Sequence, residues 1–266
     1  MSFQSFDDRA GGGDHAGRLA ALRQRMKAAC LDAFIVPRAD SHQGEYVAEA
    51  DARLAWLTGF TGSAGFAIVT ADKAGVFVDG RYRGQGKSQV DPAHFTPVPW
   101  PDTRPSDWLR DALPAGGRAG FDPWLHTRKE IETMEKGLAD SGIGLIAMDR
   151  NPLDAVWTDR PAPPVGRARA HDEALAGESA AGKRARLAAA LRKDGQAAAF
   201  LSLPDSISWL LNIRGADIPR VPVMQAFAIV TDEGRCLVFT EPTRPLDGIA
   251  PFGDEVAFTD IAEFAE

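Results

Sequence analysis

The stretch Phe66-Ala-Ile-Val-Thr70 occurs a second time, letter for letter, as Phe227-Ala-Ile-Val-Thr231. Each copy is a short apolar run rich in β-branched residues, which is typical of a buried strand. After a short polar turn, each is followed by a second apolar run, Gly75-Val-Phe-Val-Asp79 in the first copy and Gly234-Arg-Cys-Leu-Val-Phe-Thr240 in the second. The two stretches therefore predict two β-hairpins of the same construction.

The similarity extends upstream of both hairpins in the same order: an Ala- and Leu-rich helix, a strand, and a helix end that runs into a glycine-bearing turn. The matched pairs are Leu19–Arg23 with Leu187–Arg192, Ala33-Phe-Ile-Val36 with Ala199-Phe-Leu-Ser202, and Trp56–Gly62 with Trp209–Gly215. This order predicts an α/β fold class with two related domains, each a mixed β-sheet flanked by helices. Two unrelated α/β domains that share common short patterns are the alternative.

The first copy continues well past its hairpin. Two prolines in Phe95-Thr-Pro-Val-Pro99 predict an edge strand, a helix is expected over Asp107–Leu113, and Thr127-Arg-Lys-Glu130 fits a capping box that begins a further helix. The strand Gly144–Met148 follows. The second copy reaches Glu266 just inside a helix that begins near Asp260, so we expect the second domain to be truncated and the chain to be a fragment of a longer product.

The proline-rich stretch Arg160-Pro-Ala-Pro-Pro-Val165 separates the two copies. Its three prolines cannot continue a helix or a central strand, which is typical of a stiff linker. We therefore expect a flexible N-terminus at residues 1–13, a first domain at 14–159, a linker and lead-in at 160–182, and an incomplete second domain at 183–266.

Composition excludes several classes of protein. The 266 residues carry a formal net charge of −7, with basic residues scattered among acidic ones, which argues against a nucleic-acid partner. No apolar run approaches the length of a membrane span, so no membrane partner is expected. Cys30 and Cys236 each lie in or beside an apolar segment and are expected to be buried thiols without a disulfide, which indicates a cytoplasmic protein.

Catalytic signatures are sparse. The five histidines are not paired at metal-ligand spacing, and neither HExxH nor CxxC occurs. Ser63 lies in Phe60-Thr-Gly-Ser-Ala-Gly65, which lacks the spacing and flanking order of a nucleophile elbow, so this segment is interpreted as a turn whose glycines supply a positive φ. Asp79 is expected to cap the next helix, while Arg81 could face a ligand or a partner domain. The polar stretch Asp40–Tyr46 could line a substrate mouth or be a solvent-exposed loop.

Several of these strings, taken together, resemble long-form Xaa-Pro aminopeptidases of the creatinase/prolidase class from about Leu19 to near the C-terminus. The strings are Asp40-Ser-His-Gln-Gly-Glu-Tyr-Val-Ala48, Phe60-Thr-Gly-Ser-Ala-Gly65, Val78-Asp-Gly-Arg-Tyr82, Leu153-Asp-Ala-Val-Trp-Thr-Asp-Arg-Pro161 and Trp209-Leu-Leu-Asn-Ile-Arg-Gly215. The resemblance implies two creatinase-N-type domains followed by a pita-bread domain. It also implies an enzyme that removes the N-terminal residue preceding a proline.

In that class two divalent metal ions, typically manganese, lie in the C-terminal domain, so the resemblance assigns no catalytic or metal-binding role to any residue of this chain. It implies peptides with proline at the second position as substrates of the whole enzyme, and a homodimer. Residues that could contribute to substrate access or interdomain contacts are His42, Tyr46, Ser63, Arg81 and Tyr82. The alternatives are a free-standing creatinase-N-like module that binds a ligand or partner, and a complete enzyme with unknown chemistry in the region Asp40–Tyr82.

Overall fold

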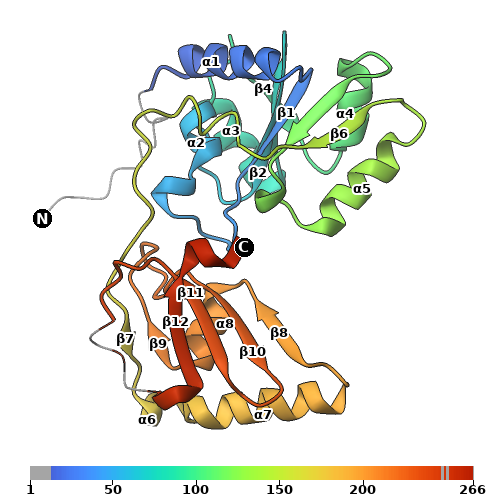
Figure 1. Cartoon of the computed structure of the whole chain (residues 1–266). Coiled ribbons are helices and arrows are strands. Elements are labelled where there is room, and N and C mark those ends of the chain that lie inside the picture. The colour runs from blue at the N-terminus through green and yellow to red at the C-terminus, as the bar shows by residue number, and fades with distance from the viewer. Residues whose placement is uncertain (1–12, 247–248, 250–251, 266) are drawn as a thin grey trace, which may run out of the picture. The chain divides into compact units, whose positions relative to one another are not determined.

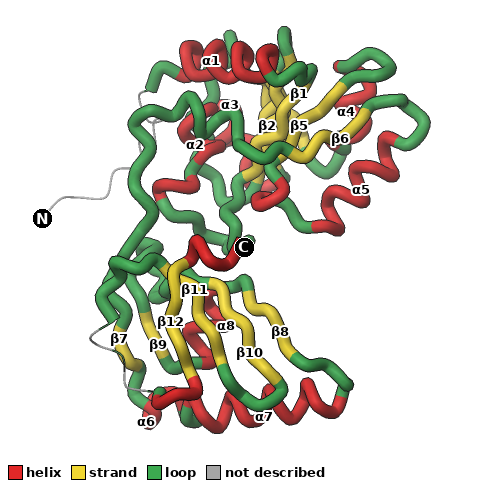
Figure 2. The backbone as a smooth tube through the Cα atoms, viewed as in Figure 1, coloured by secondary structure: helices red, strands yellow, loops and turns green. Residues whose placement is uncertain are grey.

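The structure is a computed structural model that describes residues 13–246, 249 and 252–265 (Figures 1 and 2). The expected flexible N-terminus lies, up to residue 12, outside the described residues. Two compact units make up the rest. The first unit comprises the described residues up to Ala39 together with Glu49–Pro161, and the second comprises Asp40–Ala48 together with the described residues from Ala162 onward.

The first unit is built on a six-stranded mixed sheet with the order β4-β3-β2-β1-β5-β6. Its strands are β1 (Ala33–Pro37), β2 (Gly65–Thr70), β3 (Ala74–Val78), β4 (Thr96–Pro99), β5 (Arg118–Phe121) and β6 (Gly144–Ala147). Its helices are α1 (His15–Ala28), α2 (Arg53–Thr58), α3 (Arg83–Gln89), α4 (Pro105–Ala112) and α5 (Arg128–Leu138), with the 3-10 turns η1 (Glu49–Asp51), η2 (Gly80–Tyr82) and η3 (Pro123–Leu125). β1 pairs antiparallel with β2 and parallel with β5.

Both faces of this sheet are buried, because alternate side chains of each strand point to opposite faces. One face presents Phe34 and Val36 of β1 to helices α1 and α2. The other presents Ile35 of β1 and Ile68 of β2 to helices α4 and α5. The expected capping box is confirmed at Thr127, and β4 with its two prolines lies at an edge of the sheet as expected.

The second unit has a four-stranded sheet with the order β12-β11-β10-β8 and a separate two-stranded sheet, β7 with β9. Its strands are β7 (Arg169–Ala170), β8 (Ala198–Leu201), β9 (Ile213–Arg214), β10 (Phe227–Thr231), β11 (Cys236–Thr240) and β12 (Val256–Asp260). Its helices are α6 (Glu173–Ala176), α7 (Ala180–Lys193) and α8 (Pro204–Leu210), with the 3-10 turns η4 (Gly253–Glu255) and η5 (Ile261–Ala265). The helix expected from Asp260 is therefore a short 3-10 turn.

The sheet registers relate the two units residue by residue. Ile68 pairs with Ile35 across β2 and β1, and the repeated Ile229 pairs with Phe200 across β10 and β8. Phe200 is thus the counterpart of Ile35, and the expected match of Ala199 with Ala33 is wrong by one residue. The order helix, strand, helix, hairpin is nevertheless the same in both units, which confirms two related domains, the second of them short.

The two units differ in how their sheets are covered. Ala228 and Val230 of β10 point into the single large apolar core of the described part of the second unit. The opposite face carries Phe200 and Leu237, which remain 52% and 37% exposed. In the first unit the matching row is under α4 and α5, and Ile35 is only 1% exposed. This face of the second sheet therefore leaves apolar side chains partly exposed to solvent, whereas the corresponding face of the first sheet is buried in a hydrophobic core.

Candidate functional site

Ser63 and Tyr82 come together at one end of the hairpin β2–β3. The antiparallel register pairs Gly65 with Val78, so the residue two positions before β2 meets the turn η2 that follows β3. The two side-chain oxygens lie 2.7 Å apart. Because the Ser63 hydroxyl can donate to the phenolate, this hydrogen bond lowers the pKa of Tyr82 below its ordinary value.

Arg81 lies next to this pair. Asp79 caps η2, as expected, by accepting a hydrogen bond from the Arg81 backbone N–H at 2.9 Å. The Arg81 guanidinium also donates to Asp79 at 2.7 Å, and this bond is the main cause of the lowered pKa of Asp79. The Arg81 side chain remains 66% exposed and lies 5.2 Å from the centre of the Tyr82 ring. The cluster therefore presents a cationic group and a phenol side by side.

Two residues that the sequence did not single out, Gln85 and Gln89, hold the turn before β2 in place. Gln89 is buried and bonds Thr61 twice, accepting from its backbone N–H and donating to its hydroxyl, both at 2.9 Å. Gln85 also donates to the Thr61 hydroxyl, at 3.1 Å. Both glutamines come from α3, so this short helix fixes the loop that carries Ser63.

The glycines of this turn have a different role from the one expected. Neither Gly62 nor Gly65 is among the residues with a positive φ, so the expectation that they supply a left-handed conformation is wrong. A Cβ atom on Gly62 would lie 2.2 Å from the Phe60 ring, and one on Gly65 would lie 2.7 Å from the Phe77 carbonyl oxygen. Close approach of neighbouring groups therefore requires glycine at both positions.

His42 and Tyr46 belong to the second unit, in a segment without helix or strand that we call the strap (residues 40–48). His42 is buried. Its Nδ1 lies 3.1 Å from the Ser202 carbonyl oxygen, and its ring centre lies 4.4 Å from that of Phe227. Tyr46 is half-exposed. The strap is therefore not simply a solvated loop, because its first residues are packed while Tyr46 is accessible.

In the part of the chain that the structure describes, Ser63 and the two cysteines show no bond to a group that would activate them as nucleophiles. Ser63 bonds a tyrosine rather than a histidine or carboxylate base. Burial raises the pKa of the Cys236 thiol to about 11. Cys30 was expected to be buried, but it is exposed because it lies in the turn after α1, with φ of 54°. These groups favour ligand contact over covalent chemistry.

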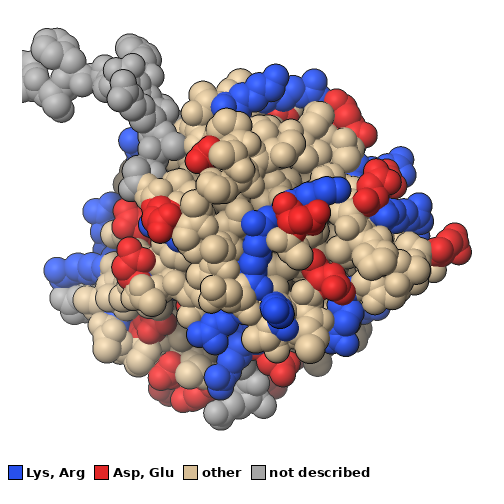
Figure 3. All heavy atoms as spheres, turned by 90° about the horizontal axis from the view of Figure 1, so that it is seen from above, with Lys and Arg blue, Asp and Glu red and all other residues tan. Residues whose placement is uncertain are grey.

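A dinuclear metal centre does not fit the residues that the structure describes, since it places no three His, Cys, Asp or Glu side chains where they could hold a metal ion. Among these residues there is also no helix long and apolar enough to cross a bilayer. On the face shown in Figure 3, Lys and Arg side chains are interspersed with Asp and Glu rather than gathered in one broad patch of a single sign.

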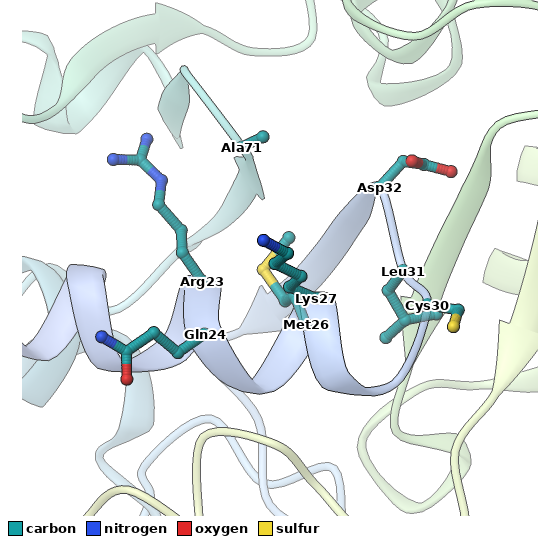
Figure 4. A pocket seen from close by; sticks show the side chains of 8 residues that line it. All are labelled: Arg23, Gln24, Met26, Lys27, Cys30, Leu31, Asp32 and Ala71. Atoms are coloured by element: carbon teal, nitrogen blue, oxygen red, sulfur yellow. The ribbon is translucent and has the colours of Figure 1, made fainter.

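A surface hollow of about 520 Å³ lies beside α1, and its lining residues come from α1, from the turn after it and from the β2–β3 turn (Figure 4). Two of its polar side chains make structural hydrogen bonds. Arg23 donates to the Thr70 carbonyl oxygen at 2.9 Å, and Asp32 accepts from the Arg118 backbone N–H at 2.9 Å. The Arg23 bond ties α1 to β2, and the residues that line the hollow form no converging set of catalytic groups.

Comparison with known proteins gives two family matches that together cover nearly the whole chain. The creatinase/prolidase N-terminal domain matches residues 18–150, and a second model with the same description matches residues 159–264. The chain belongs to the creatinase/prolidase N-terminal domain family. Both units are thus creatinase/prolidase N-terminal domains, as their shared topology indicates.

Similar full-length proteins are aminopeptidases. The probable Xaa-Pro aminopeptidase P of Neosartorya fischeri is 38% identical over 242 residues, which is 90% of this chain and 37% of that protein. Aminopeptidase P2 of Arabidopsis thaliana is 40% identical over 204 residues, 75% of this chain and 29% of that protein. This creatinase/prolidase N-terminal pair therefore spans less than half the length of these relatives.

A solved structure has a similar fold. The X-prolyl aminopeptidase from Caenorhabditis elegans, described as a cytosolic enzyme with a di-nuclear active site, matches with a TM-score of 0.86 and 28% identity. The match covers 95% of this chain and 43% of that one. The creatinase/prolidase N-terminal domains described here thus correspond to a portion of a peptidase.

Proposed function

We propose that this chain is the non-catalytic N-terminal portion of a metal-dependent Xaa-Pro aminopeptidase that removes N-terminal residues preceding proline. The observation that carries the proposal is similarity to aminopeptidases along 90% or more of the chain, to one in sequence and to another in structure. The domain limits 14–159 and 183–266, joined by the linker 160–182, belong to this proposal. So do the two divalent metal ions, with manganese as the favoured metal, which are assigned to polypeptide outside these residues.

The role proposed for this portion is to shape access to the active site and to support dimerisation. Arg81 and Tyr82 favour the first role, because an exposed guanidinium beside a phenol with a lowered pKa suits contact with a polar peptide substrate. Ser63 positions the phenol, and the half-exposed Tyr46 together with the buried His42 is assigned to access or to contacts between domains. A cytoplasmic location is proposed from the C. elegans relative, described as cytosolic, and from the two unpaired cysteines.

The test uses the full-length product of the gene, loaded with manganese and assayed on an Xaa-Pro peptide. Arg81→Ala is expected to raise KM about tenfold with a smaller change in kcat, because it removes a contact that binds rather than reacts. Arg128→Ala, whose side chain is 92% exposed on α5, is the matched control and is expected to change neither constant. A reading frame without a metal-binding domain, or an unchanged KM for Arg81→Ala, would count against the proposal.

A further inference from the structure

The strap is an insertion relative to the internal repeat. In the first unit, β1 ends at Pro37 and α2 begins at Arg53, whereas in the second unit β8 ends at Leu201 and α8 begins at Pro204. Connections as long as the first, without helix or strand over most of their length, are uncommon in compact domains and are usually functional. The first copy therefore carries a segment that the second copy lacks, and this segment packs into the second unit.

The first residue of the strap is fixed by hydrogen bonds to its carboxylate. Asp40 is buried, and it accepts from the His42 backbone N–H at 3.0 Å and from the Gly44 backbone N–H at 3.2 Å. It also accepts from the Gln225 side-chain amide at 3.2 Å. The first two bonds shape the strap itself, whereas the bond from Gln225 joins this carboxylate to the body of the second unit.

Gln225 is in turn held by a fully buried ion pair. Arg244 Nη1 and Asp217 Oδ1 lie 2.7 Å apart, and both side chains are 0% exposed. Asp217 accepts from the Gln225 backbone N–H at 2.6 Å. The Gln225 carbonyl oxygen accepts from the hydroxyl of Thr240, which also accepts a bond from Arg244. The backbone of Gln225, from which its side chain reaches Asp40, is therefore held by the pair.

The same ion pair forms hydrogen bonds with the backbone of the linker. Arg244 donates to the carbonyl oxygens of Gly166 at 2.8 Å and Pro164 at 3.2 Å, while Asp217 accepts from the Gly166 backbone N–H at 2.8 Å. A Cβ atom on Gly166 would lie 2.9 Å from Asp217 Oδ1 and 2.7 Å from the backbone of Ala216, so the linker approaches the pair as closely as glycine allows. One buried pair thus contacts the linker directly and the strap through Gln225.

We propose that Arg244, Asp217 and Gln225 are positioning residues that dock the strap on the second unit and so fix the place of His42 and Tyr46. Breaking a buried ion pair by removing one partner leaves an uncompensated buried charge and is strongly destabilising, so the groups bonded to this pair depend on both of its partners. The role of the strap in substrate access rests on the proposed function, but its docking is a property of this chain and can be measured without any activity.

The test is hydrogen exchange with mass spectrometry on the 266-residue chain, following peptides from the strap, from residues 162–168 of the linker, and from strands β10 and β11. Gln225→Met removes only the side-chain amide, so hydrogen exchange in the strap should become about tenfold faster while exchange in the linker is unchanged. Losing one hydrogen bond to a charged group shifts a local opening equilibrium by about tenfold. Arg244→Met should raise exchange in both segments. Arg235→Met, a mostly exposed arginine in the same unit, is the matched control and should raise neither.

This pattern separates a positioning role from a general structural one. An unchanged strap in Gln225→Met, or a change in Arg244→Met confined to the linker, would overturn the proposal. Equal loss of protection across β10 and β11 in Gln225→Met would also overturn it, because Gln225 would then support the whole sheet. If the strap responds as expected but Arg81→Ala leaves KM unchanged in the full-length enzyme, the docking stands and the access role fails.

Discussion

Two matched substitutions at equivalent positions of the two sheets probe the difference in how the sheets are covered. Ile35 of β1 and Phe200 of β8 occupy the same place in the repeated register. Ile35 is 1% exposed and Phe200 is 52% exposed. Threonine, isoleucine and phenylalanine all favour strands, so the comparison isolates burial from strand propensity.

The expected costs follow from what each side chain loses. Ile35→Thr removes apolar atoms from a closed core and buries a hydroxyl, which together cost about 3–4 kcal/mol. Phe200→Thr loses roughly half of a ring's burial and its contacts with Phe227 and Phe264, at centroid distances of 5.8 and 5.1 Å, for about 1–2 kcal/mol. The new hydroxyl at position 200 can reach water, so it adds no desolvation penalty. We expect a difference of about 2 kcal/mol.

The assay is hydrogen exchange in a urea series, because peptides from β2 and β10 report the free energy of unfolding of the two units separately. Phe200→Thr should also reduce binding of a dye specific for exposed apolar surface, whereas Ile35→Thr should not. Equal costs for the two substitutions would refute the reasoning, since they would mean that the row on the second sheet is as closed as the one on the first.

Three further outcomes are expected. Arg53→Met removes a buried guanidinium that bonds Asp51 and Asp154, and because both aspartates keep Arg160 as a partner, the free energy of unfolding of the first unit should fall by about 1–3 kcal/mol. Arg128→Met, in an exposed pair on α5, should cost less than about 0.5 kcal/mol in the same urea series. Ser63→Ala should raise the pKa of Tyr82 toward its ordinary value, as measured by ultraviolet titration in a background where Tyr46 is replaced by phenylalanine. Because the folded state favours the ionised phenol, the stability that Ser63 contributes should grow as pH rises through the lowered pKa of Tyr82. An unchanged pKa of Tyr82 in Ser63→Ala would contradict the geometry. Cys30→Ser should reduce the number of thiols that react with DTNB in the native protein from one to none, because Cys236 is buried and its pKa is raised to about 11. A second reactive thiol in the native wild-type protein would contradict this expectation.

Much of the fold can be predicted from the sequence because the short apolar, β-branched run Phe66–Thr70 is by itself sufficient to indicate a strand. Its counterpart begins and ends at the expected residues, Phe227 and Thr231. The pairing of the preceding strand cannot be predicted as well, because Ala198-Ala199-Phe200 offers two apolar alignments that differ by one residue and only the hydrogen-bonded register chooses between them.

The candidate site shows the same limit more strongly. Ser63 and Tyr82 could be singled out by motif, and their contact follows from a hairpin whose register is local. The docking of Asp40 on Gln225 joins residues that are 185 positions apart, and no periodicity or spacing in the chain encodes such a contact. The one available signal was the polar, glycine-bearing stretch after β1, which is longer than a simple connection requires.

Manganese binding by the isolated 266-residue chain, measured by isothermal titration calorimetry alongside release of the residue before proline from an Xaa-Pro peptide, tests the central claim most directly. If these two domains form the non-catalytic portion of an aminopeptidase, the titration shows no stoichiometric binding and the peptide stays intact with or without the metal. Two tightly bound manganese ions per chain, or proline-directed cleavage that depends on manganese, would contradict the account.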